Sequence, residues 1–178
     1  TIKELREQEK TEVKARKEKA YKIYTAEELE GLEEAKKNIM NKYKNAKVLD
    51  VDGIVVNKNV IKFDSLPYIK GGRTVVPVRA ITQGLGADVQ WDAETKTVTV
   101  TRGDIVIELV IGSSVALVND VEVELDSQSE ITNSRTYVPI RFISEVFRAK
   151  VTWDAENDIV EIEDGAVTTT EPAVTTTE

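Results

Sequence analysis

The sequence predicts an α+β fold: two tandem antiparallel-sheet units, each with one packed helix, preceded by a helical arm and followed by a disordered Thr-rich tail. The main observation is a repeat, because residues 73–100 recur as residues 135–162 at an offset of 62, with 13 of 28 positions identical. Hydrophobic spacing also changes from a helical to a strand period near residue 48. The chain therefore divides into an arm (1–47), a duplicated body (48–164) and a linker (165–178).

The arm is predicted to contain two helices. Residues 1–24 lack Pro and Gly and are rich in Glu, Lys and Arg, but their apolar stripe is thin, so this helix frays or needs a partner. Thr25 and Glu28 have the spacing of a capping box and predict a second helix over about 26–43. Its apolar stripe favours packing on the chain's own body, and the alternative is a coiled-coil contact with a second chain.

Each copy of the repeat, at about 54–100 and 116–162, begins with a predicted hairpin whose turn contains Asn57 or Asn119. Pro77 and Pro139 follow a short strand and mark the start of a helix. Gly86 in the first copy is replaced by Arg148 in the second, so the two helix ends are expected to differ. Residues 105–111, between the copies, are apolar on both faces over part of their length, which predicts a strand that is central or sandwiched rather than at an edge.

Composition excludes several kinds of chemistry. The chain has no Cys and no His, which removes disulfides, thiol nucleophiles and the commonest metal ligand and general base. Residues 51–178 carry 11 Lys/Arg against 21 Asp/Glu, an acidic balance that disfavours nucleic acid. No apolar run is long enough to span a membrane. We expect no cofactor and no enzymatic activity.

Four arginines recur in pairs, Arg73 with Arg79 and Arg135 with Arg141. They could clamp an anion, since guanidinium binds carboxylate or phosphate bidentately. The favoured interpretation is structural, because candidate partners recur at the same offset. Those partners are Asp64, Asp92, Asp126 and Asp154.

The aromatic residues suggest both core and surface roles. Trp91 and Trp153 are in phase with core-type valines and are predicted to be core residues rather than sugar-stacking platforms. Truncation of either to Ala is then expected to cost about 3 to 5 kcal/mol of stability. Tyr68 and Tyr137 are expected to be exposed and are candidate ligand contacts.

Three weaker patterns in the sequence resemble functional motifs. Asp50 with Asp52, or Asp126 with Glu130, offers part of the oxygen set that Ca²⁺ requires. No acidic pair stands out as the catalytic pair of a glycosidase. Residues 102–104, Arg-Gly-Asp, match an integrin-binding tripeptide, but Gly-Asp is ordinary turn chemistry and a turn is predicted.

The two ends of the chain carry different signals. Residues 165–178 contain Thr-Thr-Thr-Glu twice and are similar to an extracellular interdomain linker that carries O-linked glycans. The sequence starts at Thr1 without an initiator Met or signal peptide, so a mature or excised fragment is expected. We expect another domain to follow the linker.

The repeated pattern resembles the copper amine oxidase N-terminal-like (stalk) domain family. It consists of a hairpin Asn, then Arg-Thr-x-Val-Pro-Val/Ile-Arg-x-Ile, then Ala-x-Val-x-Trp-Asp-Ala-Glu and Val-x-Val/Ile, and it occurs twice within about residues 48–164. The resemblance implies a stalk, an antiparallel sheet curled about a helix, that is separate from a catalytic domain. It also implies that the parent protein is a secreted or wall-associated protein of a Gram-positive bacterium. It does not imply copper, because the oxidases hold that metal through histidines of another domain.

From these observations we expect a non-catalytic extracellular or cell-surface spacer or protein-interaction module that presents or anchors a neighbouring domain. Its partner would be a protein or a cell-wall component, with self-association through the helical arm as a further hypothesis. The alternative is a glycan-binding module for cell wall or polysaccharide.

Overall fold

The computed structural model describes residues 1–164, and the predicted Thr-rich linker at 165–178 lies outside them. The described residues form four helices and three sheets, so the α+β class is confirmed. The helices are α1 (Ile2–Lys22), α2 (Ala26–Lys42), α3 (Val78–Gly84) and α4 (Ile140–Val146). The strands are β1 (Lys47–Val48), β2 (Ile54–Val56), β3 (Asn59–Val60), β4 (Tyr68–Lys70), β5 (Arg73–Pro77), β6 (Asp88–Asp92), β7 (Thr97–Arg102), β8 (Ile105–Val110), β9 (Val115–Val118), β10 (Val121–Glu124), β11 (Glu130–Thr132), β12 (Arg135–Pro139), β13 (Ala149–Asp154) and β14 (Ile159–Asp164).

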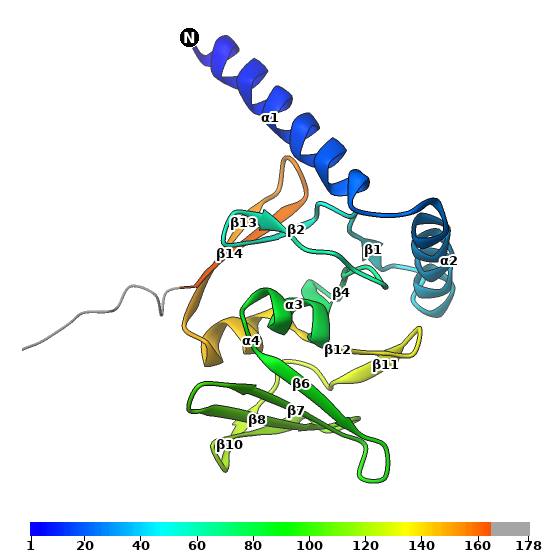
Figure 1. Cartoon of the computed structure of the whole chain (residues 1–178), viewed down its shortest axis with the longest axis vertical. Helices are drawn as coiled ribbons and strands as arrows, with labels where there is room; N and C mark the ends of the chain where they lie inside the picture. Colours follow the sequence, from blue (N-terminus) through cyan, green and yellow to red (C-terminus); the bar gives the residue numbers. More distant parts are fainter. Residues whose placement is uncertain (165–178) are drawn as a thin grey trace, which may run out of the picture.

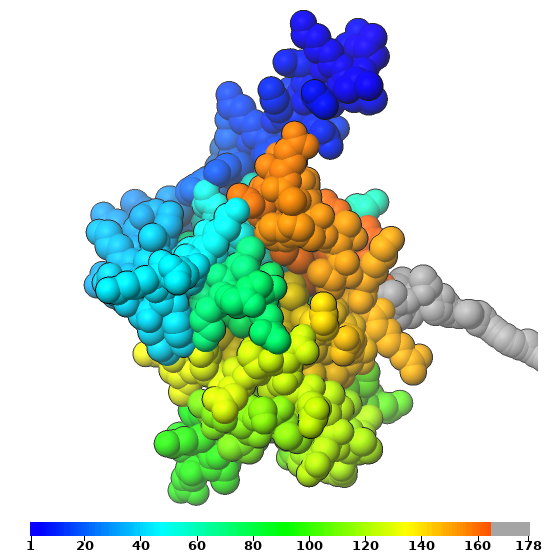
Figure 2. Space-filling model, turned by 180° about the vertical axis from the view of Figure 1, so that it is seen from behind, coloured from blue at the N-terminus to red at the C-terminus, as the bar shows by residue number. Residues whose placement is uncertain are grey.

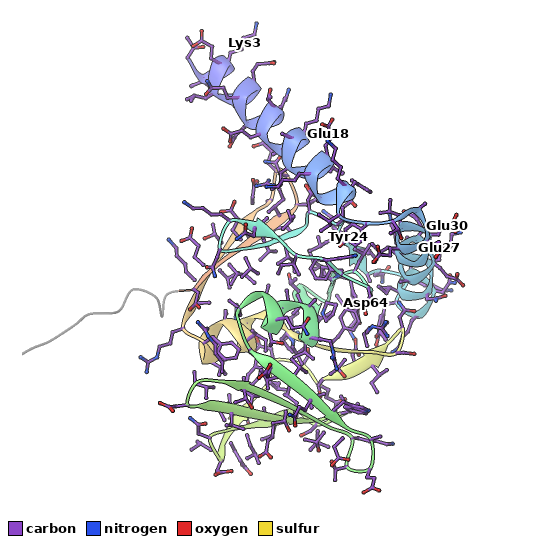
Figure 3. The ribbon with its side chains drawn as sticks, in the orientation of Figure 1. Lys3, Glu18, Tyr24, Glu27, Glu30 and Asp64 are labelled. Atoms are coloured by element: carbon purple, nitrogen blue, oxygen red, sulfur yellow. The ribbon has the colours of Figure 1, made fainter. Side chains whose placement is uncertain are left out.

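The first helix of the arm stands away from the body (Figures 1 and 2). Ile2 and Leu5 are 71% and 63% exposed, and Figure 3 shows Lys3 near the projecting end of this helix. The C-terminal part of α1 is anchored on the body through buried Ala20, through an ion pair of Lys17 with Asp50 and through Tyr24 just beyond the helix. None of the helices in residues 1–164 has both the length and the apolarity needed to cross a bilayer.

The second helix of the arm packs on the chain's own body. Thr25 and Glu28 form the predicted capping box at its start. Its buried side chains are those of Leu32, Ala35 and Ile39, at the predicted spacing of three and four residues. Packing of α2 on the body is therefore confirmed.

The two repeat copies are interleaved. The sheets have the strand orders β1-β4-β5-β12-β11, β13-β14-β2-β3 and β10-β9-β8-β7-β6, so each contains strands of both copies (Figure 1). The first hairpin of one copy shares a sheet with the last hairpin of the other, and β2 pairs in parallel with β14. The prediction that each tandem unit has its own sheet is therefore wrong.

The centre of the first sheet shows how the copies are related. Val76 of β5 lies opposite Val138 of β12, which is its own counterpart at the offset of 62. Val75 and Pro77 lie opposite Pro139 and Tyr137 in the same symmetric way. A local two-fold relation therefore passes through this strand pair, and features of one copy recur on its other side.

The local predictions for each copy agree with the structure at most points. Both hairpin turns have positive φ at two residues, Asn57 with Lys58 and Asn119 with Asp120. Pro77 and Pro139 are the N-cap residues of α3 and α4. The predicted apolar stripes of both helices belong to the main core cluster: Val78, Ile81, Leu85, Ile140, Ile143 and Phe147.

Two local predictions require correction. The C-terminal ends of α3 and α4 are alike, because Arg148 adopts a φ of 54° where Gly86 has 78°. A non-Gly residue in this conformation carries a steric cost, which surrounding structure offsets. The linking strand β8 is central as predicted, but only one face is buried. Ile107 and Leu109 have no exposed surface, whereas Val106 and Val110 are 39% and 48% exposed.

Candidate functional site: two related grooves

Two grooves flank the central β5–β12 pair and occupy related positions in the two copies. We call the first the Trp91 groove; its volume is about 910 Å³. It is lined by Glu28, Lys62, Phe63, Asp64, Pro77, Val78, Arg79, Ala80, Gln83, Val89, Trp91, Val98, Ile131, Ser134, Arg135 and Thr136. We call the second the Arg141 groove; its volume is about 580 Å³. It is lined by Gly71, Gly72, Arg73, Thr74, Asp126, Pro139, Ile140, Arg141, Ser144 and Val151.

The repeated Arg and Asp residues form an ion pair in each groove, between the copies in the first and within the second copy in the other. In the Trp91 groove Arg135 of the second copy pairs with Asp64 of the first, with Nε 2.7 Å from Oδ2. In the Arg141 groove Arg141 pairs with Asp126, with Nη1 3.6 Å from Oδ2. The predicted structural ion pairs are thus present for Arg135 and Arg141.

The other two arginines depart from that interpretation. Within residues 1–164 neither Arg73 nor Arg79 makes an ion pair, and both are exposed. Asp92 and Asp154 are not partners of these arginines. Asp92 accepts backbone hydrogen bonds within the β6–β7 turn, and Asp154 accepts from Asn157 within the β13–β14 turn. Their repetition reflects turn geometry.

The prediction that both tryptophans are core residues is wrong. Trp91 is 44% and Trp153 42% exposed. The predicted phase is correct, because each lies opposite a buried valine, Val98 or Val160. However, β6 and β13 are edge strands, so each indole has a strand neighbour on one side only.

The prediction that Tyr68 and Tyr137 are exposed is also wrong, because neither side chain has exposed surface. Together with Ile39 of α2 and Val75 they form a second core cluster. Their rings lie 4.9 Å apart, and Tyr137 donates a hydrogen bond to the carbonyl oxygen of Leu66 at 2.7 Å. These tyrosines help to dock α2 on the central sheet and cannot contact a surface ligand.

Glu130 is the acceptor at the centre of this cluster. It accepts hydrogen bonds from Tyr43 at 2.6 Å and Tyr68 at 2.5 Å, and Lys70 lies 3.3 Å away. Burial acts to raise the pKa of Glu130, but these hydrogen bonds and the charge of Lys70 outweigh it and lower the pKa. Burial and the bond to Glu130 raise the pKa of Tyr43 to about 12.

Sequence reasoning missed this cluster, although one signal for it was available. Tyr68 and Glu130 occupy equivalent positions, 62 residues apart, and carry complementary side chains.

The weaker sequence patterns have structural roles. Asp50 pairs with Lys17 at 2.9 Å and accepts from Tyr21, which holds the end of α1 on the body. No group of three or more His, Cys, Asp or Glu within residues 1–164 is arranged to hold a metal ion. The Arg-Gly-Asp tripeptide lies at the β7–β8 turn, with Gly103 at a φ of 57°, as predicted. Arg102 of that tripeptide makes an ion pair with Asp164.

Comparison with known proteins adds two findings. Residues 55–162 match the copper amine oxidase N-terminal domain family. A protein named "Protease inhibitor" from Brevibacillus choshinensis is 32% identical over 111 residues. That alignment covers 57% of this chain and 34% of the relative, so the chain spans about a third of the relative's length.

Proposed function

From the premise that the chain belongs to the copper amine oxidase N-terminal domain family, we propose that it is a non-catalytic module of an extracellular or cell-surface protein, which presents a neighbouring domain and binds a protein partner. The family assignment supports a non-catalytic role, because the matched domain is the N-terminal one. The name of the Brevibacillus relative supports protein binding, since a protease inhibitor acts by contacting another protein. The matched region forms only part of that relative, which fits a module.

The observation that carries the proposal is the Trp91 groove. The groove is lined by a half-exposed indole and by a guanidinium with no ion pair within residues 1–164, and Trp and Arg are among the residues that most often dominate binding energy at protein interfaces. The groove is built on an edge strand and the start of a helix, which hold its walls in place. The projecting helix α1 supports the spacer part of the proposal.

Binding to cell walls tests the proposal. We expect fluorescently labelled protein to bind saturably to the isolated walls of a Gram-positive bacterium, and to lose this binding when wall proteins are first removed by protease. The untreated walls provide the partner, and the stripped walls provide the matched control. Absence of saturable binding to untreated walls would contradict the proposal.

A glycan-binding module is the second candidate, favoured by the exposure of both Trp91 and Trp153. Exposed indoles present flat apolar faces on which sugar rings can stack. Under this alternative the protein would bind protein-stripped walls as tightly as untreated walls. It would also bind soluble polysaccharide, and that binding would be lost in a Trp91→Ala, Trp153→Ala double variant.

A further inference from the structure

We propose that the Trp91 groove is a peptide-binding site, which takes an extended segment of a partner protein carrying one carboxylate beside an apolar side chain. This inference rests on the proposed protein-interaction function and names the site and the chemistry of its ligand. It follows from the apolar surface of the groove, from its charges and from its difference from the Arg141 groove.

The apolar surface of the groove is incompletely covered. Trp91 is 44% and Ile131 43% exposed, and both belong to its lining. Pro77, Val78 and Val89 lie in the same lining. Covering the exposed faces of Trp91 and Ile131 with an apolar group of a ligand removes water from them and favours binding. The volume of about 910 Å³ lies in the range of natural ligand sites.

The charges of the groove select a single carboxylate. Five charged side chains line it, and four of them neutralise one another. Lys62 lies 2.6 Å from Glu28, and Arg135 lies 2.7 Å from Asp64 (Asp64 is labelled in Figure 3). Arg79 is the fifth, and within residues 1–164 it makes no ion pair. A ligand carboxylate can therefore bind its guanidinium without displacing an existing partner.

The surrounding body limits how acidic the ligand can be. Residues 51–178 carry 11 Lys/Arg against 21 Asp/Glu, so a run of acidic residues would be repelled. At physiological ionic strength this repulsion is screened beyond about 8 Å, and one carboxylate next to Arg79 responds mainly to that arginine. The site thus favours a single acidic residue.

The same charges disfavour a sugar as the ligand. Sugar hydroxyls both donate and accept hydrogen bonds, and the two carboxylates of the groove, Glu28 and Asp64, are already held in ion pairs that a sugar would have to share. The hydrogen bond from Lys62 also lowers the pKa of Glu28, which keeps it ionised and paired. The cationic Arg79 contributes little to an uncharged glycan and much to a carboxylate.

The Arg141 groove is a natural control. It is smaller, at about 580 Å³, and neither Trp153 nor any residue of α2 belongs to its lining. Arg141, the counterpart of Arg79, is already paired with Asp126. The related position of the two grooves therefore does not give them the same binding chemistry.

The test uses an array of capped eight-residue peptides, each with a single Glu two or three positions from a Phe or Leu. An identical array has Gln in place of Glu. Binding of fluorescein-labelled peptides is measured by anisotropy for the wild type, Trp91→Ala and Arg79→Gln. The matched controls in the other copy are Trp153→Ala and Arg141→Gln.

We expect Glu peptides to bind saturably and the Gln versions to bind at least about tenfold more weakly, the loss typical of a charge-assisted hydrogen bond. Trp91→Ala and Arg79→Gln should each weaken binding by a similar factor, whereas both control variants stay within about twofold of the wild type. The inference is overturned if no Glu peptide binds, if Glu and Gln peptides bind equally, or if the control variants lose binding equally.

The wall-binding assay separates this inference from the proposed function. Loss of wall binding in Trp91→Ala, but not in Trp153→Ala, supports both. Wall binding that persists in Trp91→Ala leaves the proposed function standing and overturns this site. Peptide binding without wall binding supports the site and contradicts the proposed partner.

Discussion

The two repeat copies build the same elements, yet their polar side chains differ where equivalent positions meet. Tyr68 and Glu130 are equivalent and hydrogen-bond at 2.5 Å, and Arg102 and Asp164 are equivalent and form an ion pair. Identical residues at such positions would place like charges or two acceptors against each other. The comparison teaches that polar contacts between equivalent positions require the copies to differ, whereas the apolar contact of Val76 with Val138 allows identical residues. The turns and the helix starts at Pro77 and Pro139 also stay alike.

The largest expected effect comes from the pair Arg102 and Asp164, whose side chains are 22% and 4% exposed. Asp164→Leu leaves the guanidinium without this carboxylate and should cost about 3 kcal/mol of unfolding free energy. Adding Arg102→Met should recover most of that loss, because an apolar pair replaces a charged one. Urea denaturation measures both.

The exposed pair of Lys47 and Asp158 is the control for this prediction. Its side chains are 56% and 46% exposed, so Lys47→Met should cost less than about 1 kcal/mol. A double variant at 102 and 164 that is as unstable as Asp164→Leu alone would contradict the assigned role of the pair.

The second effect concerns Glu130, the counterpart of Tyr68. Glu130→Gln removes a charged acceptor from Tyr43 and Tyr68 and should cost about 2 kcal/mol at pH 7. Because the pKa of Glu130 is lowered on folding, its contribution is present above pH 4.5 and is lost as pH falls through the folded pKa.

Thermal unfolding between pH 3 and 7 measures this dependence. The wild type should lose its advantage over Glu130→Gln as the pH is lowered below about 4.5. Glu124→Gln, on an exposed position of β10, serves as the control and should leave the profile unchanged. An advantage that stays constant down to pH 3 would argue against an ionised Glu130 as the acceptor.

A smaller effect is expected where the copies share a conformation but not a residue. Arg148 has a φ of 54°, and its counterpart is Gly86. Arg148→Gly should therefore stabilise the protein by about 1 kcal/mol, and Gly86→Ala should destabilise it by a similar amount. Differential scanning calorimetry on both variants checks the prediction. Equal melting temperatures for Arg148→Gly and the wild type would mean that Arg148 contributes contacts that offset its strain.

The smallest effect is expected at Asp52, which is 5% exposed and corresponds to Ser114. Burial, together with the charge of Asp50, raises the pKa of Asp52, although Lys17 and Arg16 act in the opposite direction. The wild type therefore loses stability as pH rises from about 3.8 through the folded pKa. Asp52→Ser should raise Tm by a few degrees at pH 7 and by less at pH 3.5. A lower Tm at pH 7 would show that the carboxylate makes a net favourable contribution.

Most local structure could be predicted from the sequence, because its causes are local. The turns at Asn57 and Asn119 need positive φ, the capping box needs Thr25 and Glu28, and Pro77 marks the start of a helix. Each of these depends on residues a few positions apart.

Strand partners and burial at the edges could not be predicted in the same way. Periodicity assigned Trp91 to the face that also carries buried Val98, but it does not show that β6 is an edge strand. Tyr68 and Tyr137 are buried because α2 and Glu130 cover them, and Glu130 is 62 residues from Tyr68. The offset of 62 could have predicted this contact, because complementary side chains at equivalent positions indicate that the two copies touch there.

The interleaving of the copies can be tested directly with the two tryptophans, one in each copy. Trp153→Phe leaves Trp91 as the reporter of the third sheet, and Trp91→Phe leaves Trp153 as the reporter of the second. If every sheet depends on both copies, urea unfolding followed by fluorescence and by far-UV circular dichroism should give one coincident transition for each variant. The fluorescence midpoints of the two variants should then differ only by as much as their circular dichroism midpoints differ. A Trp91 signal that unfolds at a different urea concentration from the circular dichroism of the same variant would show that the copies fold as separate units, and would contradict the account.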